Sequence, residues 1–323
     1  GIALHAAATL LLETAPQPHP PRPDPRVPAG APAPAPGPVG LTARALAERT
    51  RRQVALAADV AGVALCPRRL GTAIRSAANT AGSARHLTSA LAPAMHLTGP
   101  TGPPRALAWG SVPMAAVAAV KTAYGCTVND VVLAIATGAL RRHQEATRTF
   151  DPHGRSPKAL IPIGDPGSVD DPTSNRFSVT RVDLPVTVDD PLERVRLLHD
   201  RMHGGTAPSV RAIMPYVFSI ADVLPPPIMR RVFPPVLSHQ PLVNLAVSNI
   251  PGSRTPLYLW ESRLLALHPF IDVVGSVAMI IGVLSYCDDL GVGVTVDPDV
   301  AGDPDEMRTH LRAAADELGA LVR

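Results

Sequence analysis

The sequence predicts an α/β fold with a mixed β-sheet for its C-terminal two thirds, and three observations support this prediction. Segments with helical spacing of apolar residues are interspersed with segments of strand type. The strand segments are of two kinds, alternating as in Val179 to Val186 and continuously apolar as in Leu242 to Val247, which is typical of a mixed sheet. The chain has 323 residues, 46% of them hydrophobic, enough for about two domains with real cores.

The N-terminal part differs in composition from the rest. Residues 1–14 are apolar enough for a short buried helix, and eleven prolines follow between Pro16 and Pro38. Proline lacks the amide donor and clashes with the preceding helical turn, so this run is expected to be an extended linker. Two Ala-rich helices are expected at about 41–65 and 68–91, separated by Cys66-Pro67.

The elements after the Gly/Pro hinge at 99–104 follow from the period of the apolar residues. Further helices are expected near 113–124, 128–147, 190–203, 207–222 and 303–322. Strands are expected near 105–110, 158–163, 175–186, 243–249, 262–268, 276–286 and 290–297. The longest uncharged apolar stretch, Val273 to Cys287, is too short for a membrane span and is predicted to be a buried strand.

Charge is unevenly distributed along the chain. Residues 41–104 carry eight arginines against two acidic residues, whereas residues 288–323 carry nine acidic residues against three arginines. The basic region favours an anionic partner, such as a lipid surface or the phosphates of CoA. Nucleic acid is not expected as a partner, because aromatics make up only 3% of the chain and no recognised module accompanies the arginines.

The sequence lacks the motifs of several classes of metal, nucleotide and catalytic site. The three cysteines stand far apart with no CxxC pairing, so neither a zinc ribbon nor a disulfide framework is expected, and a reducing cytoplasm fits best. His199 and His203 are four residues apart on a predicted helix, but no third ligand is apparent nearby, so they are expected to be exposed and no metal site is predicted. GxSxG, Walker and GxGxxG motifs are absent.

Two motifs combine polar residues with a defined local structure. Thr127 followed by Asp130 resembles a capping box at a helix N-terminus, with Asn129 in the same first turn. Ser248-Asn249-Ile250-Pro251-Gly252 ends an apolar strand in a turn, since Pro fixes φ and Gly permits positive φ. Both patterns are explained by local structure alone, so a functional role needs further support.

That support comes from a family resemblance. The segments Thr127 to Arg141 and Pro241 to Tyr258 resemble, in order and spacing, the TVNDVVLA and SNxPGP-like motifs of the wax ester synthase/diacylglycerol acyltransferase family. Three further segments are similar to motifs of that family: Trp109 to Pro113, Leu284 to Leu290, and Ser174 to Ser178, which contains Asn175 and Arg176. Ser174 stands where the family usually has Gly, and the upstream segment Pro162 to Gly167 departs from the family pattern.

The resemblance implies two chloramphenicol-acetyltransferase-like α/β lobes that face each other across a substrate tunnel. Residues 1–15 would end the first lobe, 16–40 would form the Pro-rich linker, 41–104 a basic helical inter-lobe segment, and 105–323 the C-terminal lobe. It also implies that Asn129, Asp130, Asn175, Arg176, Ser248, Asn249 and Gly252 lie beside the substrates. The catalytic HHxxxDG motif of the family is not found, since no two histidines are adjacent, and no catalytic residue is carried over. The first residue is Gly1, which favours a processed or trimmed polypeptide, and no signal peptide is expected.

The function implied is O-acyl transfer from acyl-CoA, as co-substrate and without another cofactor, to diacylglycerol or a long-chain alcohol. Without the general base, this chain alone is expected to be incomplete and inactive. The alternative is a non-catalytic descendant that binds lipid or a protein partner. Further expected partners are an anionic membrane or lipid-droplet surface and a separate N-terminal lobe, and the expected location is the cytoplasm, peripherally on membranes or lipid bodies.

Overall fold

The computed structural model describes residues 12, 14, 37–65, 91–164, 177–204, 226–240 and 242–322. The expected helices at 1–14, 68–91 and 207–222 fall in whole or large part outside the described residues, as do most of the Pro-rich linker and the predicted site residues Asn175 and Arg176. The described residues include a six-stranded sheet and the helices that cover it.

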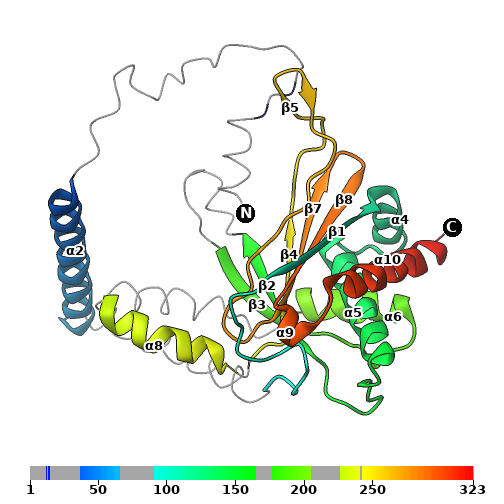
Figure 1. Cartoon of the computed structure of the whole chain (residues 1–323), viewed down its shortest axis with the longest axis horizontal. Coiled ribbons are helices and arrows are strands. Elements are labelled where there is room, and N and C mark those ends of the chain that lie inside the picture. Colours follow the sequence, from blue (N-terminus) through cyan, green and yellow to red (C-terminus); the bar gives the residue numbers. More distant parts are fainter. Residues whose placement is uncertain are drawn as a thin grey trace.

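A six-stranded mixed sheet organises the described part of the chain (Figure 1). Its order is β1 (Ala106–Pro113), β8 (Asp289–Val296), β7 (Met279–Tyr286), β4 (Leu245–Ile250), β2 (Lys158–Gly164) and β3 (Phe177–Asp183). The strand β4 runs parallel to both of its neighbours, whereas the outer pairs are antiparallel. The predicted mixed sheet is confirmed. Its central strands are continuously apolar because helices cover one side and an irregular segment covers part of the other.

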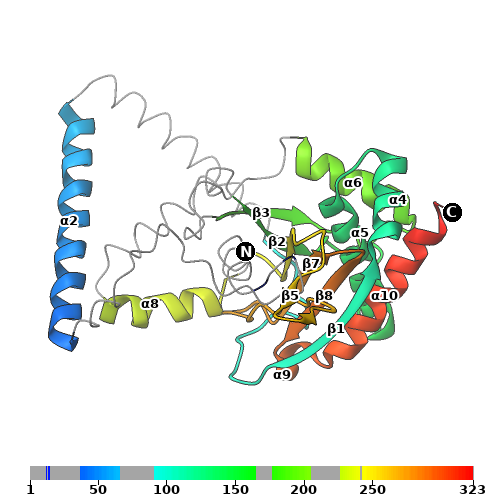
Figure 2. The same ribbon diagram turned by 90° about the horizontal axis from the view of Figure 1, so that it is seen from above.

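One face of the sheet carries α4 (Met114–Tyr124), α5 (Val128–Ala146), α6 (Pro191–His203) and α10 (Pro304–Ala320), as Figures 1 and 2 show. The central helix is α5, in which 13 of 19 residues are buried. Its Val, Leu, Ile and Ala side chains belong to one hydrophobic cluster with the sheet and with α10. These four helices match the predicted boundaries within about two residues, since each begins at a Pro, Thr or Asp signal that the sequence displays.

The other face of the sheet is approached closely by the segment 264–273. A Cβ at Gly291 would collide with the carbonyl oxygen of Leu267, and a Cβ at Gly293 or Gly282 would collide with that of Pro269. The predicted strand at 262–268 is therefore wrong, apart from Ser262–Arg263 (β6), which pairs with Tyr258–Leu259 (β5) in a hairpin. The apolar residues of this segment cross the glycine-lined face of the sheet instead of joining its edge.

Three further helices complete the described elements: α2 (Pro38–Leu65), α8 (Pro226–Ser238) and the short α9 (Pro298–Ala301). The helix α2 confirms the prediction for 41–65, and it stands apart from the sheet in both views (Figures 1 and 2). The helix α8 was not expected, because it contains Pro234 and Pro235. No single helix of the described ranges has the length and apolar composition to cross a bilayer; α4 and α5 meet that test only together, as a pair bent by 109°.

Candidate functional site

The N-terminus of α5 is built as the sequence predicts. The Thr127 hydroxyl accepts the Asp130 amide at 3.2 Å, and Asp130 Oδ2 accepts the Thr127 amide at 2.9 Å, which completes a capping box. Asp130 is fully buried, whereas Asn129 beside it is partly exposed. The box satisfies two orphan amides and holds the first turn of α5 rigid, with Asn129 presented from it.

The Asp130 carboxylate meets the C-terminal end of α6, 69 residues later in the chain. His199 Nδ1 lies 2.8 Å from Asp130 Oδ2, and His203 Nδ1 lies 4.0 Å from Asp130 Oδ1. The two imidazole rings stack with centroids 4.5 Å apart. The structure thus corrects the expectation that the two histidines stand without a third potential ligand. His203 is exposed as predicted, but His199 is only partly exposed.

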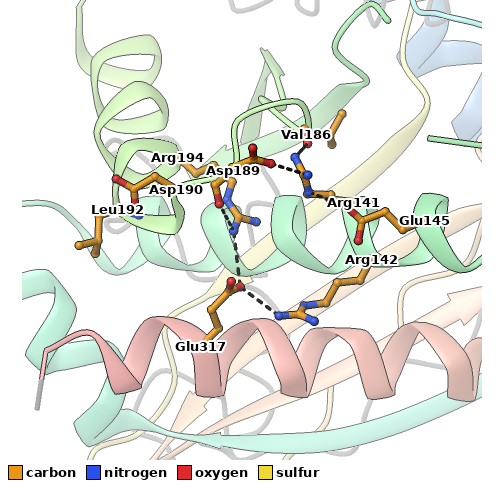
Figure 3. A network of polar contacts seen from close by, with 9 residues as sticks. All are labelled: Arg141, Arg142, Glu145, Val186, Asp189, Asp190, Leu192, Arg194 and Glu317. Atoms are coloured by element: carbon orange, nitrogen blue, oxygen red, sulfur yellow. Dashed lines mark hydrogen bonds and ion pairs between the residues drawn. The ribbon is translucent and has the colours of Figure 1, made fainter. Parts of the chain in front are cut away.

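A buried arginine positions α6 against α5 and α10 (Figure 3). The side chain of Arg194 is 4% exposed, and its guanidinium contacts Glu317 at 3.4 Å, which also pairs with Arg142 at 3.3 Å. Burial lowers the pKa of Arg194, and the Glu317 carboxylate opposes that shift. Gly138 leaves the room for this guanidinium, since a Cβ there would lie 2.6 Å from Arg194 Nη1.

A second ion pair fixes the loop before α6. Arg141 of α5 pairs with Glu145 at 2.9 Å, pairs with Asp189, and donates to the Val186 carbonyl at 3.0 Å (Figure 3). Asp190 then caps α6 by accepting the Leu192 amide. These contacts hold the start of α6 against α5, the helix that also carries Asp130.

The second predicted motif lies at the end of β4. Ser248 is buried and pairs in register with Gly282, while Asn249 is partly exposed opposite Val283. Gly252 donates its amide to Ser285 Oγ at 3.0 Å, and a Cβ there would collide with the Ser285 carbonyl oxygen. The glycine is therefore required by a close backbone approach, because its φ is not positive.

The structure places the two motifs in adjacent layers, one on helix α5 and one at the end of strand β4, without joining them directly. The helix α5 packs against β4. Among the described residues, however, no hydrogen bond or ion pair connects Asn129 or Asp130 with Ser248, Asn249 or Gly252. Asn175 and Arg176 cannot be placed relative to either motif, because they lie outside the described ranges.

A cluster of three histidines, which the sequence analysis missed, lies farther along α5. His96 Nε2 and His143 Nε2 are 2.8 Å apart, and the His310 ring lies 6.0 Å from the His143 ring between centroids. Burial lowers the pKa of His143 to about 4, with the neighbouring His96 and His310 acting in the same direction. The three residues come from distant parts of the chain, so no spacing in the sequence signals them.

Family comparisons agree with this architecture. The family model for the "Wax ester synthase/diacylglycerol acyltransferase catalytic domain" matches residues 1–132, and that for the "WS/DGAT C-terminal domain" matches residues 173–319. The two models occur in this order and together account for most of the chain. The chain belongs to the wax ester synthase/diacylglycerol acyltransferase family.

Individual relatives bear names consistent with that family. A Mycobacterium tuberculosis protein named "Probable diacyglycerol O-acyltransferase tgs1" is 30% identical over 239 residues, which cover 71% of this chain and 50% of the relative. The "O-acyltransferase WSD" of Acinetobacter baylyi is 29% identical over 188 residues, covering 57% of this chain and 40% of the relative. The chain thus spans about half, or less, of the length of these relatives.

A solved structure shares the fold. The wax ester synthase/diacylglycerol acyltransferase from Marinobacter aquaeolei VT8 superposes with a TM-score of 0.56 at 21% sequence identity, covering 77% of this chain and 57% of that one. The predicted acyltransferase fold with a mixed sheet is thereby confirmed.

Proposed function

We propose that this chain takes part in acyl-CoA-dependent transfer of an acyl group to the hydroxyl of diacylglycerol or a long-chain alcohol. The observation that carries the proposal is the match of two successive domains of one acyltransferase family to residues 1–132 and 173–319. Residues 105–323 would form the C-terminal lobe, 41–104 the inter-lobe segment, 16–40 the linker and 1–15 the end of the first lobe.

Acyl transfer of this kind requires a general base and hydrogen-bond donors for the oxyanion. A general base removes the hydroxyl proton of the acceptor, the oxygen attacks the thioester carbonyl, and fixed donors stabilise the tetrahedral oxyanion until CoA leaves as the thiol. No two of the eleven histidines in the 323 residues are adjacent, so an HHxxxDG base is not among them. This chain would therefore bind and orient the substrates for a base supplied by another segment.

Asn129 is the residue we assign to substrate positioning at the α5 N-terminus. It lies in the first turn of a helix whose cap is already provided by Thr127 and Asp130, so its amide is not needed for capping. It is partly exposed, and the turn that carries it is rigid. A side chain of this kind can orient a carbonyl or hydroxyl group with little loss of conformational entropy.

The β4 turn is the second element of the proposed site. Its Asn249 is partly exposed, and the backbone that follows is held by the contact of Gly252 with Ser285. Ser248 lies buried behind it. We assign this turn to the acceptor side, with Asn249 or a backbone amide as a hydrogen-bond donor. Asn175 and Arg176 are retained as substrate-binding residues on the resemblance alone.

We further propose that α2 brings the protein to an anionic lipid surface, as a peripheral protein of the cytoplasm. Val39 and Leu46, seven residues apart on one face, are 84% and 66% exposed. Arg44 and Arg51, also seven apart, are exposed on another face. An exposed helix with separate apolar and basic faces is suited to lie at a membrane interface.

The acyl-transfer proposal is tested with labelled acyl-CoA and either diacylglycerol or a fatty alcohol. The 323-residue chain alone should show no turnover, because general acid–base catalysis alone contributes about 10²- to 10⁴-fold. The DNA upstream of the Gly1 codon should encode an HHxxxD segment in frame, and the protein extended by that segment should esterify one acceptor. A folded extended protein that esterifies neither acceptor would refute the proposal.

The role of Asn129 is tested in the extended protein. Asn129→Ala should lower activity at least tenfold while the thermal midpoint barely moves, because the cap remains intact. Asp130→Ala is the comparison variant, since it removes a cap carboxylate and should cost about 0.5–2 kcal/mol of stability. Parallel losses of activity and thermal midpoint in Asn129→Ala would show that the residue is structural only.

A further inference from the structure

The contact between α5 and α6 contains a cluster of side chains that neither capping nor acyl transfer explains. Asp130, His199 and His203 each offer one potential ligand atom, and these atoms all lie within 4.8 Å of one another. Two histidines at i and i+4 on a helix face the same direction, and a carboxylate from a second element completes a set of three. Each residue is a ligand type that zinc and similar divalent ions prefer.

Among the residues that the structure describes, one oxygen of this cluster has no hydrogen-bond partner. Asp130 is fully buried, and its Oδ2 accepts both the Thr127 amide and His199 Nδ1, yet its Oδ1 makes no hydrogen bond. His203 Nδ1 is 4.0 Å from this oxygen and donates instead to the His199 carbonyl at 3.0 Å. A buried carboxylate oxygen without a partner is costly, so it marks a place where a cation would be stabilising.

The cationic side chains around the cluster are directed elsewhere. Arg196 lies over the Tyr124 ring at 5.5 Å, and Arg201 donates to the Asp183 carbonyl. Within the described ranges, no lysine or arginine forms an ion pair with Asp130. Among the described residues, the Asp130 carboxylate therefore has the α5 N-terminus and two imidazoles beside it but no lysine or arginine, and a metal ion would supply a counter-charge.

We propose that Asp130, His199 and His203 bind a divalent transition-metal ion of the zinc class. Tetrahedral zinc with ligands at about 2.0–2.2 Å requires neighbouring ligand atoms about 3.4 Å apart. Atoms within 4.8 Å reach that spacing by small rotations of the two imidazoles, which lie on the last turn of α6 with side chains 37% and 48% exposed. Their exposure also leaves the fourth position open to water or an exogenous ligand.

The site is tested by zinc titration of the purified 323-residue chain, prepared without a polyhistidine tag. Isothermal calorimetry at neutral pH should show one saturable zinc site, and cobalt(II) should give the visible absorption of a tetrahedral complex. His199→Gln and His203→Gln should each weaken binding at least tenfold. Asp130→Asn should do the same while it keeps an acceptor oxygen for the cap.

The matched control is His239→Gln. Like His203, the exposed His239 lies with its Nδ1 3.0 Å from the carbonyl oxygen four residues earlier, but it has no Asp130 beside it. The His239→Gln variant should bind zinc with the affinity of the wild type. Zinc should also raise the thermal midpoint of the wild type and of this control, but not that of His203→Gln. Absence of a saturable site, or equal binding by His203→Gln and wild type, overturns the proposal; neither result depends on acyl transfer.

Discussion

Acidification should destabilise the protein through the cluster of His96, His143 and His310, of which His143 is buried. His143 is 3% exposed, and burial lowers its pKa from the ordinary value of 6.5 to about 4. The pKa values of His96 and His310 are lowered by burial as well, although Glu306 opposes the shift of His310. All three imidazoles therefore favour the neutral form in the folded state.

The magnitude follows from the difference between the folded and unfolded pKa of His143. Well above pH 6.5 the His143 imidazole is neutral in both states and contributes no pH dependence. As the pH falls from about 6.5 to about 4, the unfolded state takes up a proton that the folded state does not, so the free energy of unfolding decreases. At about 1.4 kcal/mol per pKa unit, the loss from His143 alone approaches about 3 kcal/mol at pH 4.

The assay is urea unfolding at a series of pH values between 7.5 and 4, with His143→Gln as the test variant. Glutamine keeps a hydrogen-bonding group near His96 but cannot titrate, so the dependence of the unfolding free energy on pH should weaken by about one proton in this window. His153→Gln, in an exposed turn, should behave as the wild type does. Identical pH dependence in His143→Gln and wild type would refute the reasoning.

The remaining predictions concern two glycines and a lipid surface. Gly138→Ala should lower the thermal midpoint although alanine favours helices, because its Cβ would lie 2.6 Å from the buried guanidinium of α6; overpacking of this kind costs about 1–3 kcal/mol. Gly252→Ala should destabilise the β4 turn through its clash with the Ser285 carbonyl, whereas Gly37→Ala, which meets nothing within 4 Å, should be neutral by the same measurement. In liposome co-sedimentation, the chain should bind anionic vesicles better than neutral ones, and binding should fall with added salt. Each basic residue near the surface should contribute about 1 kcal/mol of attraction. Equal binding to neutral and anionic vesicles would contradict the electrostatic contribution of residues 41–91.

Local signals account for the part of the fold that the sequence predicts well. The capping box of Thr127 and Asp130 forms between residues three apart, so it depends on little beyond its own segment. The strands β4 and β7 are recognisable because burial on both faces leaves largely continuous apolar runs, whereas β8 is recognisable from valines that alternate with small residues. The segment 262–268 has a similar pattern, but its apolar residues cross the sheet face, which periodicity alone does not distinguish from a strand.

The sequence by itself determined the family, the mixed sheet and the rigid start of α5, because each rests on motifs or periodicities within a short stretch of chain. Only the tertiary structure decided which residues contact the N-terminus of α5. The contact of Asp130 with His199 joins residues 69 apart, and it depends on the rotation of α6 set by the buried Arg194 and its partner Glu317. Packing brings side chains of separate elements together. Because these residues are far apart in the sequence, no local pattern predicts their contact.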